Sequence, residues 1–344
     1  MDPFVLRRLG RTDLQLPRLG FGGAALGNIF DDVSDRQAEA TLETAWDLGI
    51  RYYDTSPWYG RGLSERRIGS FLHTRPAEQR IISTKVGRVF TAPADPVAFA
   101  RSERSWQMGL HFEHRHDYTY GAIMRSYEDS LQRLGLNRVS ALVIHDLDLI
   151  HFGSQDLVNR HLDELAGGGG FRALDELKAA GLIKAIGAGV NRLGTIPLFL
   201  ERFDLDFFLV ASPYTLLDQM VLDEEFPLCQ ARGVGLVIGA VFATGILATG
   251  PVEGARYNYR PATPDALDRV RRIEAVCRRH GVPLAAAALQ FPLHHPLVAS
   301  VIPGAFHPDQ VRQNVATMRH DIPDVLWSEL KAEGLIRPDA PTPP

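Results

Sequence analysis

Four residues with ionisable side chains directly follow, or closely follow, short apolar runs in this sequence. Asp54 and Tyr59 lie five residues apart in DTSPWYG. Lys85 ends RIISTK, and His145 follows ALVI. An ammonium group beside a tyrosine favours phenolate and lowers the pKa of the phenol, and a carboxylate keeps that ammonium in place. A histidine nearby can hydrogen-bond a carbonyl or hydroxyl oxygen. This set suits proton transfer at an oxygen while a hydride moves at the attached carbon.

The elements that must position these residues alternate between short apolar runs and longer amphipathic ones. The apolar runs predict eight strands, at 18–21, 50–53, 80–84, 141–144, 183–187, 207–210, 235–239 and 298–302. Helical patterns lie at 34–48, 121–134, 171–180 and 265–280, and a glycine follows each of them. This alternation predicts parallel strands with crossover helices. Eight such units close a single α/β domain, a (β/α)8 TIM barrel over residues 1–344. The four ionisable residues would then meet at one rim.

Three segments should decorate that barrel. Residues 4–14 predict an N-terminal hairpin, and residues 88–118 form a long polar and aromatic insertion after the third strand. Because the insertion follows a strand, it should lie on the C-terminal rim, where barrel active sites are built. The proline-rich stretch 336–344 predicts a loose tail.

Composition excludes several classes of protein. The 344 residues carry a formal net charge of −4, so no basic surface for nucleic acid or anionic membrane is expected. Cys229 and Cys277 share no short spacing, so neither a disulfide framework nor a zinc site is implied and a reducing, cytoplasmic compartment is favoured. Residues 233–250 are uncharged but contain five glycines, which predicts a buried strand and a glycine-rich loop rather than a membrane span. The oligomeric state is left open.

Other motifs carry weaker signals. The stretch HFEHRHD at 111–117 has three histidines, but no helix or knuckle frames them, so a solvated or substrate-facing loop is favoured over a metal site. The glycine-rich stretches at 20–27 and 187–194 lack the full spacing of a dinucleotide loop. Trp58 and Trp106 lie in predicted rim loops, where they are candidates for substrate walls or for core aromatics. Asp146 and Asp148 follow His145 at the same rim, where their carboxylates are expected to satisfy substrate hydroxyls.

Taken together and in order, these motifs resemble the aldo-keto reductase family. The resemblance runs from RLGRTDLQLPRLGFGG through DTSPWYG, ISTKVG, LGLNRVSALVIHDLD and IGAGVN to IPGAFHPDQVRQN, and it covers nearly the whole chain. It implies a barrel that binds a nicotinamide dinucleotide without a Rossmann domain. It also implies a catalytic tetrad of Asp54, Tyr59, Lys85 and His145, in which Tyr59 is the acid/base. The stretches GFGGAALGN, GLSERRIG, SLQRLGL, HDLD and YTLL resemble family members that oxidise L-fucose, other D-threo-aldoses or pyridoxal.

The resemblance also implies a cofactor site. Its members are Gly22, Gly23, Asp54, Asn191, Phe242, Gly304, Gln310, Gln313 and Asn314. Asn191 matches the residue that holds the nicotinamide carboxamide, and Gln313 and Asn314 match adenine contacts. Two positions depart from the family. Ala211 stands where a glutamine is frequent, and only Phe242 is available as the stacking aromatic.

Cofactor choice depends on two further departures. Family members that prefer NADP have a lysine and an arginine near the ribose phosphate, where this chain has Gly304 and Gln310. A 2′-phosphate needs charge-assisted partners, and only His307 and Arg312 remain close in sequence. NAD is therefore expected, with NADP as the alternative. With NAD the expected reaction is oxidation of an aldose at C1 to the lactone. Pyridoxal oxidation, NADPH-dependent aldehyde reduction and a cofactor-sensing binding subunit are the alternatives.

Overall fold

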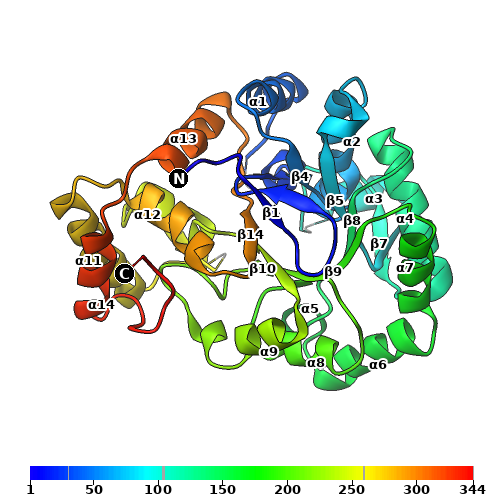
Figure 1. Ribbon diagram of the computed structural model, residues 1–344. Helices are drawn as coiled ribbons and strands as arrows, with labels where there is room; N and C mark the ends of the chain where they lie inside the picture. Colours follow the sequence, from blue (N-terminus) through cyan, green and yellow to red (C-terminus); the bar gives the residue numbers. More distant parts are fainter. Residues whose placement is uncertain (30, 103–104, 259, 344) are drawn as a thin grey trace.

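Eight short parallel strands form the centre of the molecule (Figure 1). The computed structural model describes residues 1–29, 31–102, 105–258 and 260–343. In chain order the sheet contains β3 (Phe21–Gly22), β4 (Tyr52–Asp54), β5 (Ile81–Val86), β8 (Ala141–Ile144), β9 (Ala185–Val190), β10 (Phe207–Ala211), β11 (Gly235–Gly239) and β14 (Val298–Val301). Parallel bridges from Leu19 to Val301 and from Gly22 to Gly304 join the first strand to the last. The sheet therefore closes on itself, which confirms the predicted (β/α)8 barrel.

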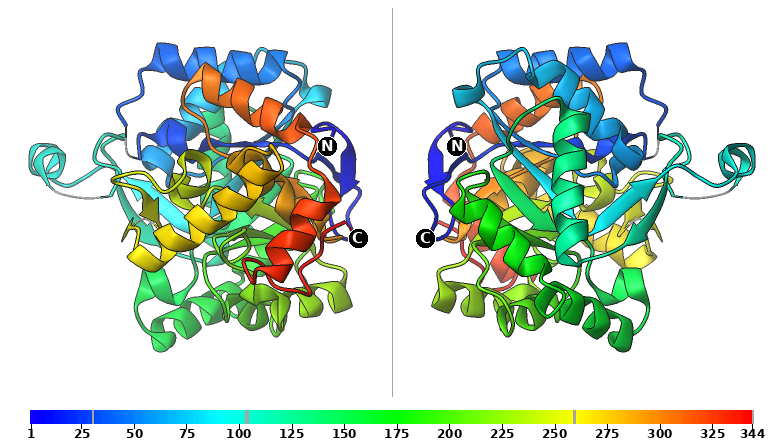
Figure 2. Two further views of the ribbon diagram at one scale, coloured as in Figure 1. Left: turned by 90° about the vertical axis from the view of Figure 1, so that its left-hand side faces the viewer. Right: turned by 90° about the vertical axis from the view of Figure 1, so that its right-hand side faces the viewer.

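Helices connect these strands and surround the barrel (Figures 1 and 2). They are α1 (Asp35–Asp47), α2 (Leu63–Leu72), α3 (Pro96–Arg101), α4 (Tyr120–Leu134), α5 (Leu149–Phe152), α6 (Gln155–Ala166), α7 (Gly170–Ala179), α8 (Thr195–Leu200), α9 (Glu225–Arg232), α10 (Ile246–Thr249), α11 (Pro264–Arg279), α12 (Leu284–Gln290), α13 (Pro308–Arg319) and α14 (Asp324–Ala332). Short 3-10 turns are η1 (Gly23–Gly27), η2 (Tyr59–Gly62), η3 (Ala77–Gln79), η4 (Met220–Leu222), η5 (Ala243–Gly245) and η6 (Phe291–His294). The four helices predicted from periodicity correspond to α1, α4, α7 and α11, each within one residue at either end.

The N-terminal hairpin closes the end of the barrel at which the strands begin. Its strands β1 (Leu6–Arg8) and β2 (Gln15–Pro17) pair from Leu6 opposite Pro17, so the hairpin extends beyond the predicted 4–14. Leu9, Leu14 and Leu16 are buried against the side chains that fill the barrel. Gly10 has a φ of 53°, and a Cβ there would lie 2.5 Å from the carbonyl oxygen of Asp206. This end is filled with apolar side chains, which leaves the opposite rim for chemistry.

The insertion at 88–118 stands on that opposite rim. It forms an antiparallel ribbon of β6 (Arg88–Thr91) and β7 (Glu113–His116), and α3 lies between them. Figure 2 shows α3 projecting well clear of the barrel at the outer edge of both views. A second ribbon, β12 (Arg256–Tyr257) and β13 (Arg260–Pro261), lies between α10 and α11 in the chain.

The C-terminal stretch is packed rather than loose. Ile336 and Ala340 are buried, and Arg337 forms ion pairs with Asp223 and Asp339. The backbone N–H of Arg337 also donates to the side chain of Gln219. The prediction of a loose tail is therefore wrong over 336–340, because apolar and charged anchors lie among its prolines. Position 344 lies outside the described residues.

The uncharged stretch 233–250 forms β11, η5 and α10, as the strand-and-loop interpretation predicted. None of the helices in the described part of the chain is long and apolar enough to span a membrane.

Candidate active site

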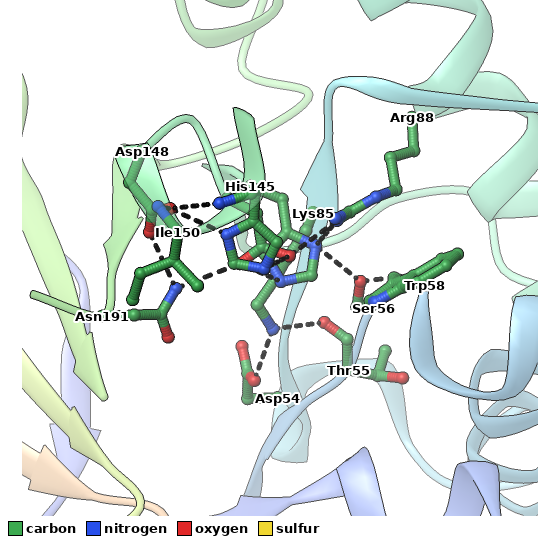
Figure 3. Close-up of polar contacts among 12 residues, drawn as sticks. Asp54, Thr55, Ser56, Trp58, Lys85, Arg88, His145, Asp148, Ile150 and Asn191 are labelled. Atoms are coloured by element: carbon green, nitrogen blue, oxygen red, sulfur yellow. Dashed lines mark hydrogen bonds and ion pairs between the residues drawn. The ribbon is translucent and has the colours of Figure 1, made fainter. Parts of the chain in front are cut away.

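A buried ion pair lies where β4 and β5 end. The Nζ atom of Lys85 donates to Oδ2 of Asp54 at 2.7 Å and to the carbonyl oxygen of Thr55 at 2.8 Å (Figure 3). The other carboxylate oxygen of Asp54 accepts from Ser83 Oγ at 2.7 Å. Both charged side chains are only 2% exposed. Removal of two charges from water is tolerated when they are paired and hydrogen-bonded, as they are here.

Tyr59 lies directly beside this pair. The Nζ atom of Lys85 is 4.5 Å from the centre of the Tyr59 ring. The rings of Tyr59 and His145 are 5.9 Å apart and nearly perpendicular, at 85°. The structure therefore brings together all four members of the tetrad that the resemblance implies. The close approach follows from the barrel, because the ends of β4, β5 and β8 are neighbours at one rim.

His145 is held by hydrogen bonds on one ring nitrogen. Its Nδ1 lies 3.0 Å from Arg88 Nη1 and 3.1 Å from Ser56 Oγ. A guanidinium can only donate, so Nδ1 must accept and the ring proton belongs on Nε2. Nε2 is 3.4 Å from Oδ1 of Asp146, which is long for a hydrogen bond.

The electrostatic surroundings of His145 agree with a neutral ring. Burial holds its pKa well below the usual range. The carboxylate of Asp146 opposes this effect, and the cations Arg88, Lys85 and His151 reinforce it. His145 is therefore a neutral donor, through Nε2, at physiological pH.

The two acids that follow β8, Asp146 and Asp148, have structural roles. Asp146 and Asp148 are 6% and 1% exposed, so they are not open rim groups for a substrate. Asp148 caps α5 by accepting from the N–H groups of Ile150 and His151. Burial raises the pKa of Asp148, but hydrogen bonds from His151 and Asn191 outweigh it and hold the pKa below the usual range. The expectation that these acids would meet substrate hydroxyls is corrected, since their oxygens are occupied within the protein.

Asn191 is oriented by the same two acids. Its Nδ2 donates to Oδ1 of Asp146 and to Oδ2 of Asp148, at 3.2 Å in both cases (Figure 3). Ionised carboxylates only accept, so this pair fixes which end of the amide is nitrogen. The carbonyl oxygen of Asn191 points away from Asp148 (Figure 3). That orientation suits an acceptor for an amide N–H of a ligand.

A cavity of about 500 Å³ begins at Tyr59 and Asp54 and reaches α13. Its walls include eight of the nine predicted cofactor residues, namely Gly22, Gly23, Asp54, Phe242, Gly304, Gln310, Gln313 and Asn314. Ala211 also lines it, whereas Asn191 lies outside its lining. Cavities of this size suit cofactors and other small ligands.

The loop after β11, which lines this cavity through Ala240 and Thr244, has a strained backbone. Ala240, Ala243 and Thr244 have φ values of 50°, 47° and 63°, although none of them is glycine. Such backbone conformations cost about 1–3 kcal/mol each and gather at ligand clamps. The strained loop and the cavity volume together fit a dinucleotide, which the residues named above would hold.

The far end of the cavity is built from the start of α13. The side chain of Gln310 accepts from the N–H groups of Phe306 and His307, at 2.9 and 3.2 Å, and so caps the helix. Arg312, the nearby basic residue, pairs with Asp309 at 2.7 Å. Gln310 is therefore a capping residue as well as a wall of the cavity, and the Arg312 guanidinium already has a carboxylate partner.

The two candidate substrate walls differ in their surroundings. The ring of Trp106 is 5.7 Å from that of Tyr59 and only 9% of the residue is exposed. Trp58 has the guanidinium of Arg88 4.5 Å from its ring centre, and the ring of His114 4.3 Å away. Trp106 thus lies beside the predicted acid/base, whereas Trp58 is packed among protein cations and rings.

Close glycine contacts fix the insertion over Tyr59. A Cβ on Gly60 would lie 2.5 Å from the carbonyl oxygen of Gly27, and one on Gly109 would lie 2.5 Å from that of Gly60. The N–H of Leu110 donates to the same Gly60 oxygen at 2.9 Å. Three loops therefore stack backbone against backbone, which places Trp106 beside Tyr59.

The histidines of 111–117 show no metal-binding arrangement. Across the described ranges, no three or more His, Cys, Asp or Glu residues gather as metal ligands would. Burial lowers the pKa of His114 to about 4 and of His116 to about 3. His116 packs against Phe152 with ring centres 4.7 Å apart. Both act as neutral packing groups.

Ser56 and Arg88, which both hydrogen-bond Nδ1 of His145, were not among the residues predicted from the sequence. Ser56 lies inside the DTSPWYG motif, two residues after Asp54, so its position offered a signal. Arg88 begins a new ribbon after β5, and no periodicity connects it with the tetrad.

Comparisons with known proteins agree with this geometry. The model of the Aldo/keto reductase family matches residues 18–333. Pyridoxal 4-dehydrogenase of Microbacterium luteolum is 44% identical, covering 96% of this chain and 97% of its own. D-threo-aldose 1-dehydrogenase of a Pseudomonas species is 40% identical, covering 96% of both. The holo form of an aldo-keto reductase from Bacillus halodurans has a TM-score of 0.74 and 28% identity, over 97% of both chains.

Proposed function

Because the chain belongs to the aldo/keto reductase family, we propose that it uses NAD to oxidise the C1 hydroxyl of a cyclic aldose to the lactone. The observation that carries this proposal is the buried Lys85–Asp54 pair beside Tyr59, at one end of a cavity of about 500 Å³. The test is turnover of purified protein with NAD or NADP and a panel of aldoses, pyridoxal and simple aldehydes. Tight NAD binding without turnover of any substrate would favour the alternative function, that of a cofactor-sensing binding subunit.

The tetrad has a defined role in this reaction. The phenolate of Tyr59, stabilised by the ammonium of Lys85, takes the proton of the C1 hydroxyl. Nε2–H of His145 donates to the same oxygen and orients it. Asp54 keeps Lys85 in place. A bound nicotinamide supplies the hydride acceptor, so the substrate loses one proton and one hydride. Asn191 would accept from the carboxamide N–H, since its Nδ2 is held by Asp146 and Asp148.

For the wild-type protein we expect kcat/KM with NAD to exceed that with NADP by at least about tenfold, or ~1.4 kcal/mol. The reason is the absence of a lysine or arginine at Gly304 and Gln310 and the pairing of Arg312 with Asp309. Gly304→Lys should narrow the gap by strengthening NADP binding. The nearest atoms to a Cβ at Gly304 are 3.6 Å and 3.8 Å away, so a side chain has room.

Gly304→Lys is a better test than Gln310→Arg, because Gln310 also caps α13. Gly121→Lys is the matched control, since it adds the same charge on α4, where nothing lies within 4 Å of a Cβ. Steady-state kinetics with both cofactors measures the effect. A wild-type preference for NADP would refute the assignment of the adenosine end.

The aldose proposal makes a stereochemical prediction. A site that hydrogen-bonds each sugar hydroxyl leaves buried polar groups unpaired when one hydroxyl is inverted, which costs orders of magnitude in kcat/KM. We therefore expect L-fucose to be oxidised far faster than its C4 epimer. Initial rates on the two sugars, at equal concentration and with NAD, decide the matter. Equal rates would remove the aldose assignment.

Pyridoxal is the second candidate, and two observations favour it. The relative named for pyridoxal is 44% identical to this chain, against 40% for the aldose enzyme. Asp146 and Asp148, which would have served sugar hydroxyls, are committed inside the protein. Pyridoxal can also present a cyclic hemiacetal to Tyr59, so the chemistry is shared. Fast oxidation of pyridoxal with no aldose turnover would replace the first candidate by the second.

A further inference from the structure

One buried arginine contacts the tetrad without belonging to it. Arg88 begins β6, three residues beyond Lys85, and is 4% exposed. Its Nη1 donates to Nδ1 of His145 at 3.0 Å and to Oδ2 of Asp146 at 2.8 Å (Figure 3). The guanidinium carbon is 4.5 Å from the centre of the Trp58 ring. A side chain that is buried, charged and clamped on three sides has little freedom to move.

We propose that Arg88 is a positioning residue that holds His145 neutral, with its proton on Nε2, for the oxidoreduction. The inference rests on the proposed function for its catalytic meaning. The hydrogen-bonding arrangement itself can be tested without turnover.

The physical reason is the sign of the charge at Nδ1. A carboxylate at that nitrogen would stabilise an imidazolium. A guanidinium has five donors and no acceptor, so it binds Nδ1 only while that nitrogen carries a lone pair. Protonation of His145 would point its new Nδ1–H at an N–H of Arg88 and would place the imidazolium charge beside the guanidinium charge. Arg88 therefore favours one tautomer and disfavours the charged ring.

The other groups around His145 do not reverse this balance. Lys85 on β5 and His151 on α5 are cationic or can become so, and both disfavour a second charge on the ring. Asp146, which follows His145, favours it, but its Oδ2 is bound by Arg88 and lies 3.3 Å from His151. Tyr59 from η2 presents its ring, 5.9 Å away. Burial acts in the same direction as Arg88 and lowers the pKa of His145.

A neutral donor suits the reaction better than a charged one. During oxidation the C1 oxygen loses its proton to Tyr59, and electron density must then flow from that oxygen to expel the hydride. An imidazolium would hold that electron density on the oxygen and so slow the transfer of the hydride. Neutral His145 binds the oxygen as alcohol and as carbonyl without opposing the change.

The test follows the ionisation of His145 by NMR of ¹⁵N-histidine-labelled protein, with the signal assigned by His145→Gln. In wild type we expect a neutral ring with Nε2–H throughout the range of about pH 5–8, where an ordinary histidine titrates. Arg88→Met removes the cation and frees the Asp146 carboxylate, so a titration should appear within that range. Arg88→Gln also removes the charge but keeps a polar amide, and it should show the same direction of change. Arg88→Lys keeps the positive charge, so in that variant His145 should stay neutral.

Activity provides the second measurement. The Arg88→Met and Arg88→Gln enzymes should show a fall in kcat at acid pH additional to the one caused by protonation of Tyr59. This additional loss should recover as pH rises through the new pKa of His145. Arg88→Lys should lack that acid-side loss. Should Arg88→Met fail to fold, the polar Arg88→Gln variant carries the test. A His145 that stays neutral in both uncharged variants would overturn the proposal, and would do so even if no substrate were known.

Discussion

Replacement of Tyr59 by phenylalanine is expected to lower kcat by about 10²–10⁴-fold while leaving the affinity for NAD nearly unchanged. The change removes only the phenol oxygen, which the proposed mechanism uses to take the proton of the C1 hydroxyl. The ring remains, so its packing beside Trp106 and His145 should persist. The cavity wall that Tyr59 contributes also remains. The loss should therefore appear in kcat and not in cofactor binding.

Single-turnover kinetics and NAD titration by tryptophan fluorescence separate these two effects. Tyr120→Phe is the matched control, because it removes a phenol that binds Glu176 on the outer surface. We expect that control to retain wild-type kcat. Turnover within a few-fold of wild type in the Tyr59 variant would show that another group moves the proton.

Much of the barrel could be predicted because its strands are buried on both faces. Residues 141–144 and 235–239 form β8 and β11 with the predicted bounds, and every residue in them is buried. The prediction of a strand at 18–21 was less accurate. Its ladder contains only Phe21 and Gly22, because Leu19 joins the sheet through a single bridge to Val301. Strand ends depend on which neighbouring carbonyl is within reach, and a linear pattern does not contain that information.

The error at 336–340 has a similar cause. Prolines signal that no helix or strand continues, but they do not signal that the chain leaves the surface. Ile336 and Ala340 bury apolar area, and Arg337 binds two carboxylates. An irregular segment is fixed by such anchors, and three residues among prolines are too few to show a period.

The tetrad could be predicted because each member lies at or just beyond a strand end, where a buried charge must have a function or a partner. The groups that orient it could not. Ser56 and Asp146 are ordinary polar residues in loops, and Arg88 begins β6. Their importance lies only in which nitrogen or oxygen they face. Asp146 shows the risk, since its type and place suggested a substrate contact, whereas it pairs with Arg88 inside the protein. Whether such a residue contacts the substrate or another side chain depends on distances between atoms across the rim, which the sequence does not contain.

Replacement of Lys85 by methionine is expected to lower kcat by about 10²–10⁴-fold, the range for loss of acid/base catalysis, and to move the remaining activity to higher pH. The ammonium lies 4.5 Å from the centre of the Tyr59 ring and favours the phenolate. Without it the phenol loses its proton only at higher pH, and oxidation needs the phenolate. Asp54→Asn should produce a weaker shift in the same direction, because Lys85 keeps its charge but loses its partner.

The Lys85 variant also leaves Asp54 buried and unpaired, which destabilises a protein by about 3–5 kcal/mol. A loss of activity through unfolding must be separated from a loss of chemistry. The double variant Lys85→Met with Asp54→Asn removes the orphaned charge, so its thermal stability should recover while its activity stays low and alkaline-shifted. The pH dependence of kcat and thermal melting curves, measured on all three variants, test this. If the double variant regained wild-type kcat, or if the single variant kept the wild-type pH profile, Lys85 would serve the structure alone.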